Sequence, residues 1–275
     1  MSLTYHLTNA LIVNEGKTFC GSIGISEGLI QKIACDDEPL PLNPEAKIID
    51  CSGCFVIPGV IDDHVHFREP GLTHKSDIFT ESRAAIAGGI TSFMEMPNTL
   101  PAATTIDLLE EKYHIASAKS LANYSFYLGA TNENAAEVAK INPTEVCGVK
   151  VFMGSSTGNM LVDDSQALEK LFSDSRGLLI AIHSEDENII SENNRLFRSK
   201  YGEDVPAQCH SLIRSEEACY RSTAKAVALA QKSNTRLHVL HVSTARELAL
   251  FNNTLPPAQK RITAEVCLHH LWFSD

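Results

Sequence analysis

Asp62-Asp63-His64-Val65-His66-Phe67-Arg68-Glu69-Pro70-Gly71 is the stretch that decides how this chain folds and what chemistry it can support. It follows an apolar run at residues 55–61, which predicts a buried strand with the two histidines near its end. Because side chains alternate along a strand, His64 and His66 point to one face and can share a metal ion. A pair of strand-end histidines without metal is the alternative. Arg68 favours the metal site, because a guanidinium beside a cation suits a small carboxylate-bearing substrate.

The composition limits the kinds of partner that the protein can have. The chain has 275 residues, of which 44% are apolar and 21% charged, as in ordinary globular proteins. Its net charge of -11 argues against nucleic acid and anionic membranes, which bind basic surfaces. No segment reaches the roughly 18 apolar residues of a membrane helix, and the first residues lack a signal-peptide pattern. We therefore expect a cytoplasmic protein that binds a small anionic substrate, and a homo-oligomer is compatible with the sequence.

The eight cysteines are irregularly spaced in a chain without an export signal. This pattern indicates reduced thiols rather than a disulfide framework. Cys51 and Cys54 form the one close pair, but no second pair stands at zinc-ribbon spacing, so we do not expect a structural zinc there.

Residues 1–55 predict a small β module. Short β-prone runs alternate with turn signals at residues 14–16 and 27–28. Such a module is too small to bury a core alone. The predicted strands are residues 5–8, 10–13, 22–25, 29–33 and 47–50.

From residue 56 onward, strands and helices alternate. Near-continuous apolar strands separated by helices specify a parallel sheet that helices cover. The predicted strands are residues 55–61, 90–96, 124–130, 147–153, 178–183, 236–242 and 261–267, with helices at 76–87, 105–119, 133–140, 165–173 and 215–232.

Polar residues gather at the C-terminal ends of these strands. In an open sheet functional groups collect at one crevice, whereas in a closed barrel nearly every strand can contribute to one mouth. We therefore predict an α/β fold, a (β/α)8 barrel of the TIM type, with seven strands before Asp275. We expect the eighth strand beyond that residue, so that residues 56–275 form a barrel whose C-terminal part is missing. The residues at the strand ends are His64, His66, Asn98, Lys150, His183, His241, His269 and His270.

Lys150 is unusual because it interrupts an apolar strand, where an unpaired ammonium is costly. It either extends its amine to solvent or reacts with carbon dioxide to give a carbamate, whose two oxygens can bridge two metal ions. His183 and His241 also end apolar strands. With His64 and His66 they give four imidazoles and one bridging carboxylate, which is nearly a binuclear zinc site. Two zinc ions that share a hydroxide would suit amide hydrolysis or its reverse.

Six motifs resemble the dihydroorotases of the amidohydrolase superfamily, in the same order along the chain. The similarity extends from about Val56 to the end, and the combination is far more specific than His-x-His alone. The motifs are residues 65–71 (VHFREPG), 95–99 (EMPNT), 150–152 (KVF), 181–185 (AIHSE), 238–243 (HVLHVS) and 265–271 (EVCLHHL).

The resemblance implies a zinc-dependent (β/α)8 hydrolase that interconverts N-carbamoyl-L-aspartate and L-dihydroorotate in pyrimidine biosynthesis. It assigns the more buried of two Zn2+ ions to His64 and His66, and the second to His183 and His241. It assigns the bridge between the ions to Lys150 as N6-carboxylysine, a carbamate formed with carbon dioxide.

The resemblance also assigns the substrate to His66, Arg68 and Asn98, the last two holding its carboxylate. It further implies that residues 1–55 are the N-terminal strands of a small β-sandwich, which the superfamily builds from both ends of the chain.

The chain departs from the family in two respects. Some dihydroorotases carry an aspartate in place of Lys150, so this chain resembles the carboxylated-lysine type. The eighth-strand aspartate, which binds metal and carries protons, has no match before Asp275. Asp163 and Asp164 follow a glycine-rich loop at residues 154–159 and do not fit that role. We therefore expect no catalytic acid–base residue within this chain, and expect the chain by itself to be inactive.

Three other functions remain open: an allantoinase, a dihydropyrimidinase-like cyclic amidohydrolase, and a catalytically inactive scaffold. Arg68 together with Asn98 favours the dihydroorotase, because a carboxylate beside the substrate ring needs a cation and an amide donor there. The four histidines and Lys150 argue against an inactive scaffold.

Six further residues have no assigned catalytic role. Glu265, His269 and His270 match the family motif, and we interpret them as supporting or packing residues. His210 and Arg214, together with Glu216, either line the mouth of the barrel or cap the helix that follows, and we favour the cap.

Overall fold

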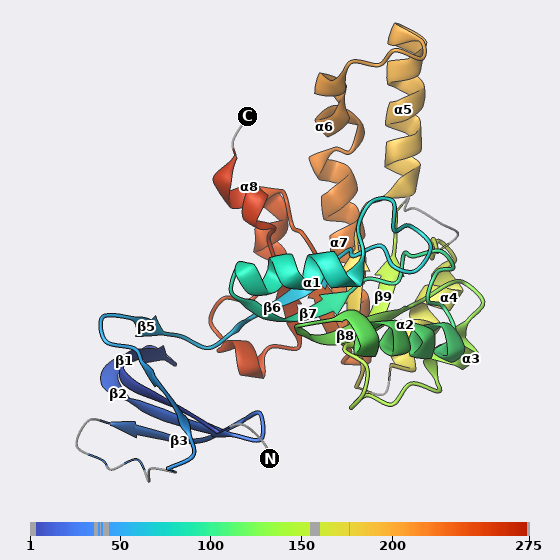
Figure 1. The fold of residues 1–275 in the computed structure, drawn as a ribbon. Coiled ribbons are helices and arrows are strands. Elements are labelled where there is room, and N and C mark those ends of the chain that lie inside the picture. Colours follow the sequence, from blue (N-terminus) through green and yellow to red (C-terminus); the bar gives the residue numbers. More distant parts are fainter. Residues whose placement is uncertain are drawn as a thin grey trace. The chain divides into compact units, whose positions relative to one another are not determined.

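The structure is a computed structural model that describes residues 4–35, 38, 40, 44–154, 160–175 and 177–273 (Figure 1). It divides the chain into two compact units, Met1–Val60 and Ile61–Asp275. The second unit has a large apolar core, whereas the first has a small cluster with four buried residues, Ala10, Ile12, Ile23 and Cys51. The expectation that the first segment buries no core of its own is therefore corrected to a small one. Most of the predicted glycine-rich loop, residues 155–159, lies outside the described residues. None of the helices described is both long and apolar enough to cross a membrane.

The first unit is a β-sheet. In its described part β2 is antiparallel to β1 and β3, whereas β4 and β5 run parallel to β1. The strand order is β3-β2-β1-β4, and β5 also pairs with β1. The completion of a sandwich by strands from the other end of the chain stays a prediction. The strands are β1 (Tyr5–Asn14), β2 (Lys17–Ser26), β3 (Leu29–Cys35), β4 (Lys47–Asp50) and β5 (Phe55–Val56).

Two tight turns connect the antiparallel strands. Both residues of Glu15-Gly16 and of Glu27-Gly28 have positive φ angles. Successive residues of this kind form the hairpin turn that matches the twist of the flanking strands. The separate strands predicted at 5–8 and 10–13 are wrong, because they form one strand. Asn9, with a φ of 56°, produces a bulge where the pairing with β2 changes register.

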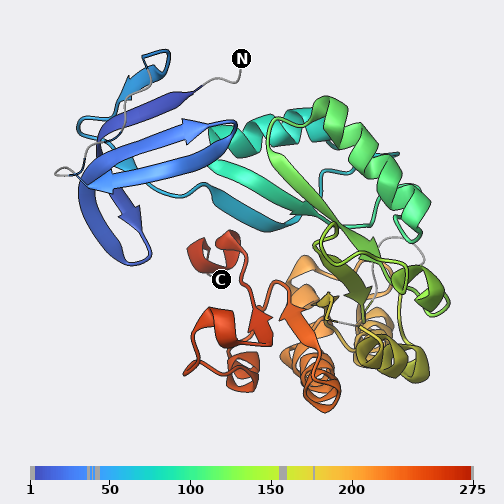
Figure 2. The same ribbon diagram turned by 90° about the horizontal axis from the view of Figure 1, so that it is seen from below.

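The second unit is a curled parallel sheet, and most of its helices lie on the outside of the curve (Figure 2). Within the described residues it has seven strands in the order β12-β11-β10-β9-β8-β7-β6. The strands are β6 (Val60–Val65), β7 (Ile90–Glu95), β8 (Asn123–Gly129), β9 (Gly148–Phe152), β10 (Leu179–His183), β11 (Arg236–Val239) and β12 (Ile262–Ala264).

Most helices follow one strand of this sheet and precede the next along the chain. The α-helices are α1 (Ile78–Ala87), α2 (Ile106–Lys119), α3 (Ala135–Val138), α4 (Ser165–Ser173), α5 (Glu187–Tyr201), α6 (His210–Ile213), α7 (Glu216–Ser233) and α8 (Leu268–Trp272). Three short 3-10 segments accompany them, η1 (Ala207–Cys209), η2 (Ala245–Leu250) and η3 (Pro257–Gln259).

Alternate residues of the strands face two different cores. Phe126 and Leu128 belong to the large cluster that includes residues of the outer helices, whereas Tyr127 belongs to a smaller cluster with Ala181. The smaller cluster therefore marks the inner face of the curl. Lys150 is the pairing partner of Ala181 between β9 and β10, and partners in a sheet share a face. The sheet therefore directs Lys150 to the inside.

The apolar run at residues 55–61 is not the single buried strand that we predicted. Pro58-Gly59 separates β5 from β6. Phe55 is 69% exposed and Ile61 is 59% exposed, so hydrophobicity alone misjudged their burial. β6 stands at one end of the strand order and therefore has one edge without a strand partner among the described residues.

Helix α5 is missing from the sequence prediction, although Asp186 caps its N-terminus. Helix α3 is shorter than the predicted 133–140, and α1 begins at Ile78 rather than at residue 76. The strands predicted at 236–242 and 261–267 end earlier, at β11 and β12. Side-chain caps at Asp77, Thr105, Asp164 and Ser215 begin α1, α2, α4 and α7.

Candidate metal centre

His64 and His66 point to the same side at the C-terminal end of β6. The Nε2 atom of His64 lies 3.3 Å from the Nε2 atom of His66, and their ring centroids are 5.2 Å apart. The intervening Val65 contacts the large core on the opposite face. Strand alternation therefore brings the two imidazoles together.

His183 and His241 bring two further imidazoles to the same place. His183 is the last residue of β10, and His241 follows β11 by two residues. The Nδ1 atom of His183 lies 2.9 Å from the Nε2 atom of His241. The ring centroid of His241 is 5.4 Å from that of His64. Four imidazoles from three strands thus form one cluster, and they line a cavity of about 580 Å3.

Lys150 is buried close to this cluster. Lys150 is 1% exposed, and its Nζ atom lies 4.6 Å from the ring centre of Phe152. Its positive charge contributes to lowering the pKa values of His66 and His241. Burial lowers the pKa of Lys150 itself well below the usual value for a lysine, and the charge of Glu265 only partly opposes this shift. The alternative of an amine extended to solvent is therefore wrong.

Three of the four imidazoles are held through the nitrogen that points away from the cluster. His64 Nδ1 donates to Glu265 Oε1 at 2.6 Å, and His66 Nδ1 donates to Asn98 Oδ1 at 2.8 Å. His183 Nε2 donates to Glu185 Oε2 at 2.7 Å. Because these oxygens act as acceptors, each bonded nitrogen carries the proton and the other nitrogen presents its lone pair to the cluster. Fixed tautomers of this kind are typical of histidines that bind metal.

Glu265 connects several parts of the site. It lies one residue after β12, accepts from the backbone N–H of His241 at 3.1 Å, and contacts His238 Nε2 at 3.3 Å. Burial opposes its ionisation, but hydrogen bonds from His238 and His64 outweigh burial and lower the pKa of the carboxyl group. This carboxylate acts as a supporting residue for two candidate ligands, as the sequence interpretation proposed.

Two of the imidazoles are kept neutral by their surroundings. Burial, followed by the charge of His64, lowers the pKa of His66 to about 3. Burial, followed by the charge of His183, lowers the pKa of His241 to about 3. Neutral imidazole is the form that binds metal, so the site favours the ligating state.

Arg68 and Asn98, the predicted substrate-binding residues, lie next to His66. Asn98 is buried and accepts the hydrogen bond from His66. Arg68 is half-buried, its charge contributes to lowering the pKa of His66, and its backbone has a φ of 68°. Its backbone N–H donates to Glu95 Oε1 at 3.1 Å. The cavity that the four histidines share is lined by neither Arg68 nor Asn98.

The prediction that Arg214 caps the helix that follows it is wrong. Ser215 caps α7 with its side chain, whereas Arg214 lines the cavity and forms an ion pair with Glu185. Glu185 in turn accepts from His183, so Arg214 belongs to the support of the site. His210 also lines the cavity. Glu185 was not predicted from the sequence as the hydrogen-bond acceptor of His183. Its position two residues after His183 in the AIHSE motif was the signal that could have revealed it.

Comparison with known proteins places these residues in a family. Residues 53–246 match the family described as Dihydro-orotase-like. A dihydroorotase of Methanosarcina acetivorans is 31% identical over 277 aligned residues, which cover 98% of this chain and 57% of that protein. An allantoinase of Deinococcus radiodurans is 33% identical, and the match covers 100% of this chain and 60% of that protein.

A solved structure with a similar fold is the L-hydantoinase of Arthrobacter aurescens, with a TM-score of 0.86 and 26% identity. The match covers 97% of this chain and 58% of that one. The chain thus spans less than two thirds of the relatives that it matches. The curled parallel sheet and this likeness confirm the predicted barrel class.

Proposed function

The chain belongs to the Dihydro-orotase-like family. On that premise we propose that it carries the metal centre of a metal-dependent cyclic amide hydrolase. One observation carries the proposal: His64 Nε2 and His66 Nε2 face each other at 3.3 Å, each with its lone pair. Two lone pairs at that distance repel unless a cation or a proton lies between them. Because burial holds His66 neutral, a metal cation fits the gap better than a proton.

The donor set fits zinc. His64, His66, His183 and His241 offer imidazole nitrogens, and a carboxylated Lys150 would add two oxygens between the pairs. Two divalent ions held there would polarise a carbonyl group and lower the pKa of water.

The surroundings of Lys150 favour its carboxylation. Carbon dioxide reacts with the neutral amine: the nitrogen bonds to the carbon, one proton leaves, and an N-carboxylate results. Burial lowers the pKa of Lys150 well below the usual value, which raises the share of the reactive neutral amine. The product would replace a buried ammonium, which has an unfavourable desolvation energy, by a metal-binding anion.

Within the hydrolase class we propose dihydroorotase activity, the interconversion of N-carbamoyl-L-aspartate and L-dihydroorotate in pyrimidine biosynthesis. Both compounds carry a carboxylate beside the reacting amide. Arg68 would bind that carboxylate with its guanidinium fork, and Asn98 would orient both the substrate and His66. Glu265 and Glu185 would hold the ligands His64 and His183 in place.

Allantoinase or hydantoinase activity is the second candidate, because an allantoinase is 33% identical to this chain and an L-hydantoinase has a similar fold, with a TM-score of 0.86. Allantoin and dihydrouracil have no carboxylate on the ring. Arg68 therefore separates the candidates: it is needed for the substrate in a dihydroorotase and has no carboxylate partner in the others.

The decisive experiment measures metal content and substrate choice on the protein as its gene encodes it. We expect about two zinc ions per chain at the centre of His64, His66, Lys150, His183 and His241, and cyclisation of carbamoyl aspartate with a higher kcat/KM than hydrolysis of allantoin or dihydrouracil. Arg68→Met should raise KM for carbamoyl aspartate by about 10- to 100-fold, the effect of losing a charge-assisted contact. Faster turnover of allantoin would replace the proposed substrate, and a protein that binds no metal would refute the hydrolase.

A further inference from the structure

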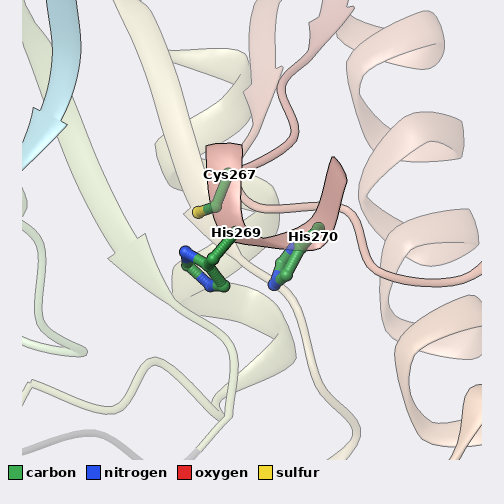
Figure 3. A group of neighbouring side chains, drawn as sticks. All are labelled: Cys267, His269 and His270. Carbon is green, nitrogen blue, oxygen red and sulfur yellow. The ribbon is translucent and has the colours of Figure 1, made fainter. Parts of the chain in front are cut away.

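Cys267, His269 and His270 form a second group of metal-binding side chains. One ligand atom from each residue lies within 4.8 Å of the other two. The side chains leave the chain around the start of α8 and lie side by side (Figure 3). All three also line the cavity that the four histidines share.

Among the described residues, the side chains of Cys267, His269 and His270 form no hydrogen bond. Cys267 is the N-cap residue of α8 but makes no capping hydrogen bond with its side chain. The rings of His269 and His270 contact each other, with centroids 4.4 Å apart. Both histidines are exposed, and within the part of the chain that the structure describes neither ring has a hydrogen bond to a protein group. Packing and capping therefore do not account for this group.

The local charge favours a cation. Burial, then the charges of Glu265 and Asp62, raise the pKa of the Cys267 thiol. The same negative field that disfavours a thiolate attracts a divalent ion, and a bound ion displaces the thiol proton.

We propose that Cys267, His269 and His270 bind a zinc ion at the rim of the cavity. One thiolate and two imidazoles suit zinc, and three protein ligands leave a fourth position for water. Zinc bond lengths of about 2.0–2.3 Å place the ligand atoms of a tetrahedral site roughly 3.3–3.6 Å apart. The three ligand atoms here lie within 4.8 Å of one another, and rotation of the two exposed imidazoles would bring them to that spacing. This site contains sulfur, whereas the candidate centre of His64, His66, Lys150, His183 and His241 contains none.

Cobalt(II) is the probe that separates the two sites. A cobalt ion bound to a thiolate has a sulfur-to-metal absorption band in the near ultraviolet, which nitrogen and oxygen ligands cannot produce. We expect the full chain, titrated with cobalt to saturation, to show this band at the intensity of about one sulfur-bound cobalt per chain. Cys267→Ser should abolish the band and His269→Gln should weaken it. Cys20→Ser, which removes an exposed cysteine of the first unit, should leave it unchanged.

Alkylation tests the proposal without any substitution. Zinc should slow the reaction of Cys267 with iodoacetamide by about tenfold or more, because a metal-bound thiolate is shielded. Cys20, followed by mass spectrometry in the same sample, should react at an unchanged rate. A cobalt band that survives in Cys267→Ser, the absence of a band in the unmodified chain, or alkylation of Cys267 that zinc does not slow would each overturn the proposed site.

Discussion

At the scale of single residues, Lys150 combines complete burial with a position beside four imidazoles. A lysine in such surroundings is costly as an ammonium ion, and becomes useful once it carries a carboxylate. Lys150→Ala should therefore remove the bridge between the two proposed ions. We expect a loss of activity of about a thousandfold, which corresponds to several kcal/mol of metal-ion catalysis, together with a lower zinc content.

Short carboxylic acids provide the control for this substitution. Acetate or propionate should enter the space left by Lys150 and partly restore both zinc binding and activity. Lys140→Ala, which removes a lysine whose side chain is 61% exposed, should change neither quantity. Unchanged zinc content and activity in Lys150→Ala would reject the bridging role.

At the scale of elements, a buried ion pair connects α2 to the end of β7, and through a hydrogen bond to the backbone of Arg68. Lys112 Nζ lies 2.8 Å from Glu95 Oε2, and each side chain is 1% exposed. Lys112 also donates to the carbonyl oxygen of Met96, while Glu95 accepts from the backbone N–H of Arg68. The pair therefore supports the left-handed backbone of Arg68, a conformation that costs an arginine free energy.

Lys112→Met should leave Glu95 buried without its counter-charge. We expect the free energy of unfolding to fall by about 3–5 kcal/mol, measured by urea denaturation. The double variant Lys112→Met/Glu95→Gln should recover part of this loss, because glutamine carries no charge and keeps an acceptor for Arg68. Lys170→Met removes the exposed helix pair with Asp174 and should change stability by about 0.5 kcal/mol or less. Equal effects of Lys112→Met and Lys170→Met would contradict this account.

Helices were predictable where local signals and burial agreed. The sequence predicted helices that begin at Thr105 and Ser215, and these residues are the N-caps of α2 and α7. Such helix starts are predictable because capping depends on residues only a few positions apart. Helix α5 escaped prediction because Ile190 is its only buried residue, so its apolar periodicity is weak. Its cap Asp186 and the following Gly202 were the signals that could have revealed it.

The candidate site was predictable only in part. His64 and His66 could be paired from sequence, because strand alternation fixes their directions. Glu265 is 201 positions from His64, and no local rule connects them. Its contact follows from the curl of the sheet, which brings the end of β12 towards the end of β6. Long-range support of this kind needs the folded structure, whereas ligand spacing does not.

At the scale of the whole molecule, the proposed ligands all belong to the second unit and join strands that are far apart in sequence. His64, Lys150, His183 and His241 come from β6, β9, β10 and the end of β11. Bound metal would therefore link both halves of the curled sheet, in addition to the hydrogen bond between Glu265 and His64. No proposed ligand lies in Met1–Val60.

Removal of metal should consequently destabilise one unit and spare the other. A metal present at a hundredfold excess over its dissociation constant stabilises the folded state by about 2.7 kcal/mol, which chelation would remove. We expect a lower calorimetric Tm after chelation, and faster amide hydrogen exchange in β6 and β9–β11. Exchange in β1–β3 should stay unchanged, because these strands contribute no ligand. Faster exchange throughout both units would mean that the metal supports the protein in some other way, and an unchanged Tm would mean that the four histidines hold no metal in the folded chain.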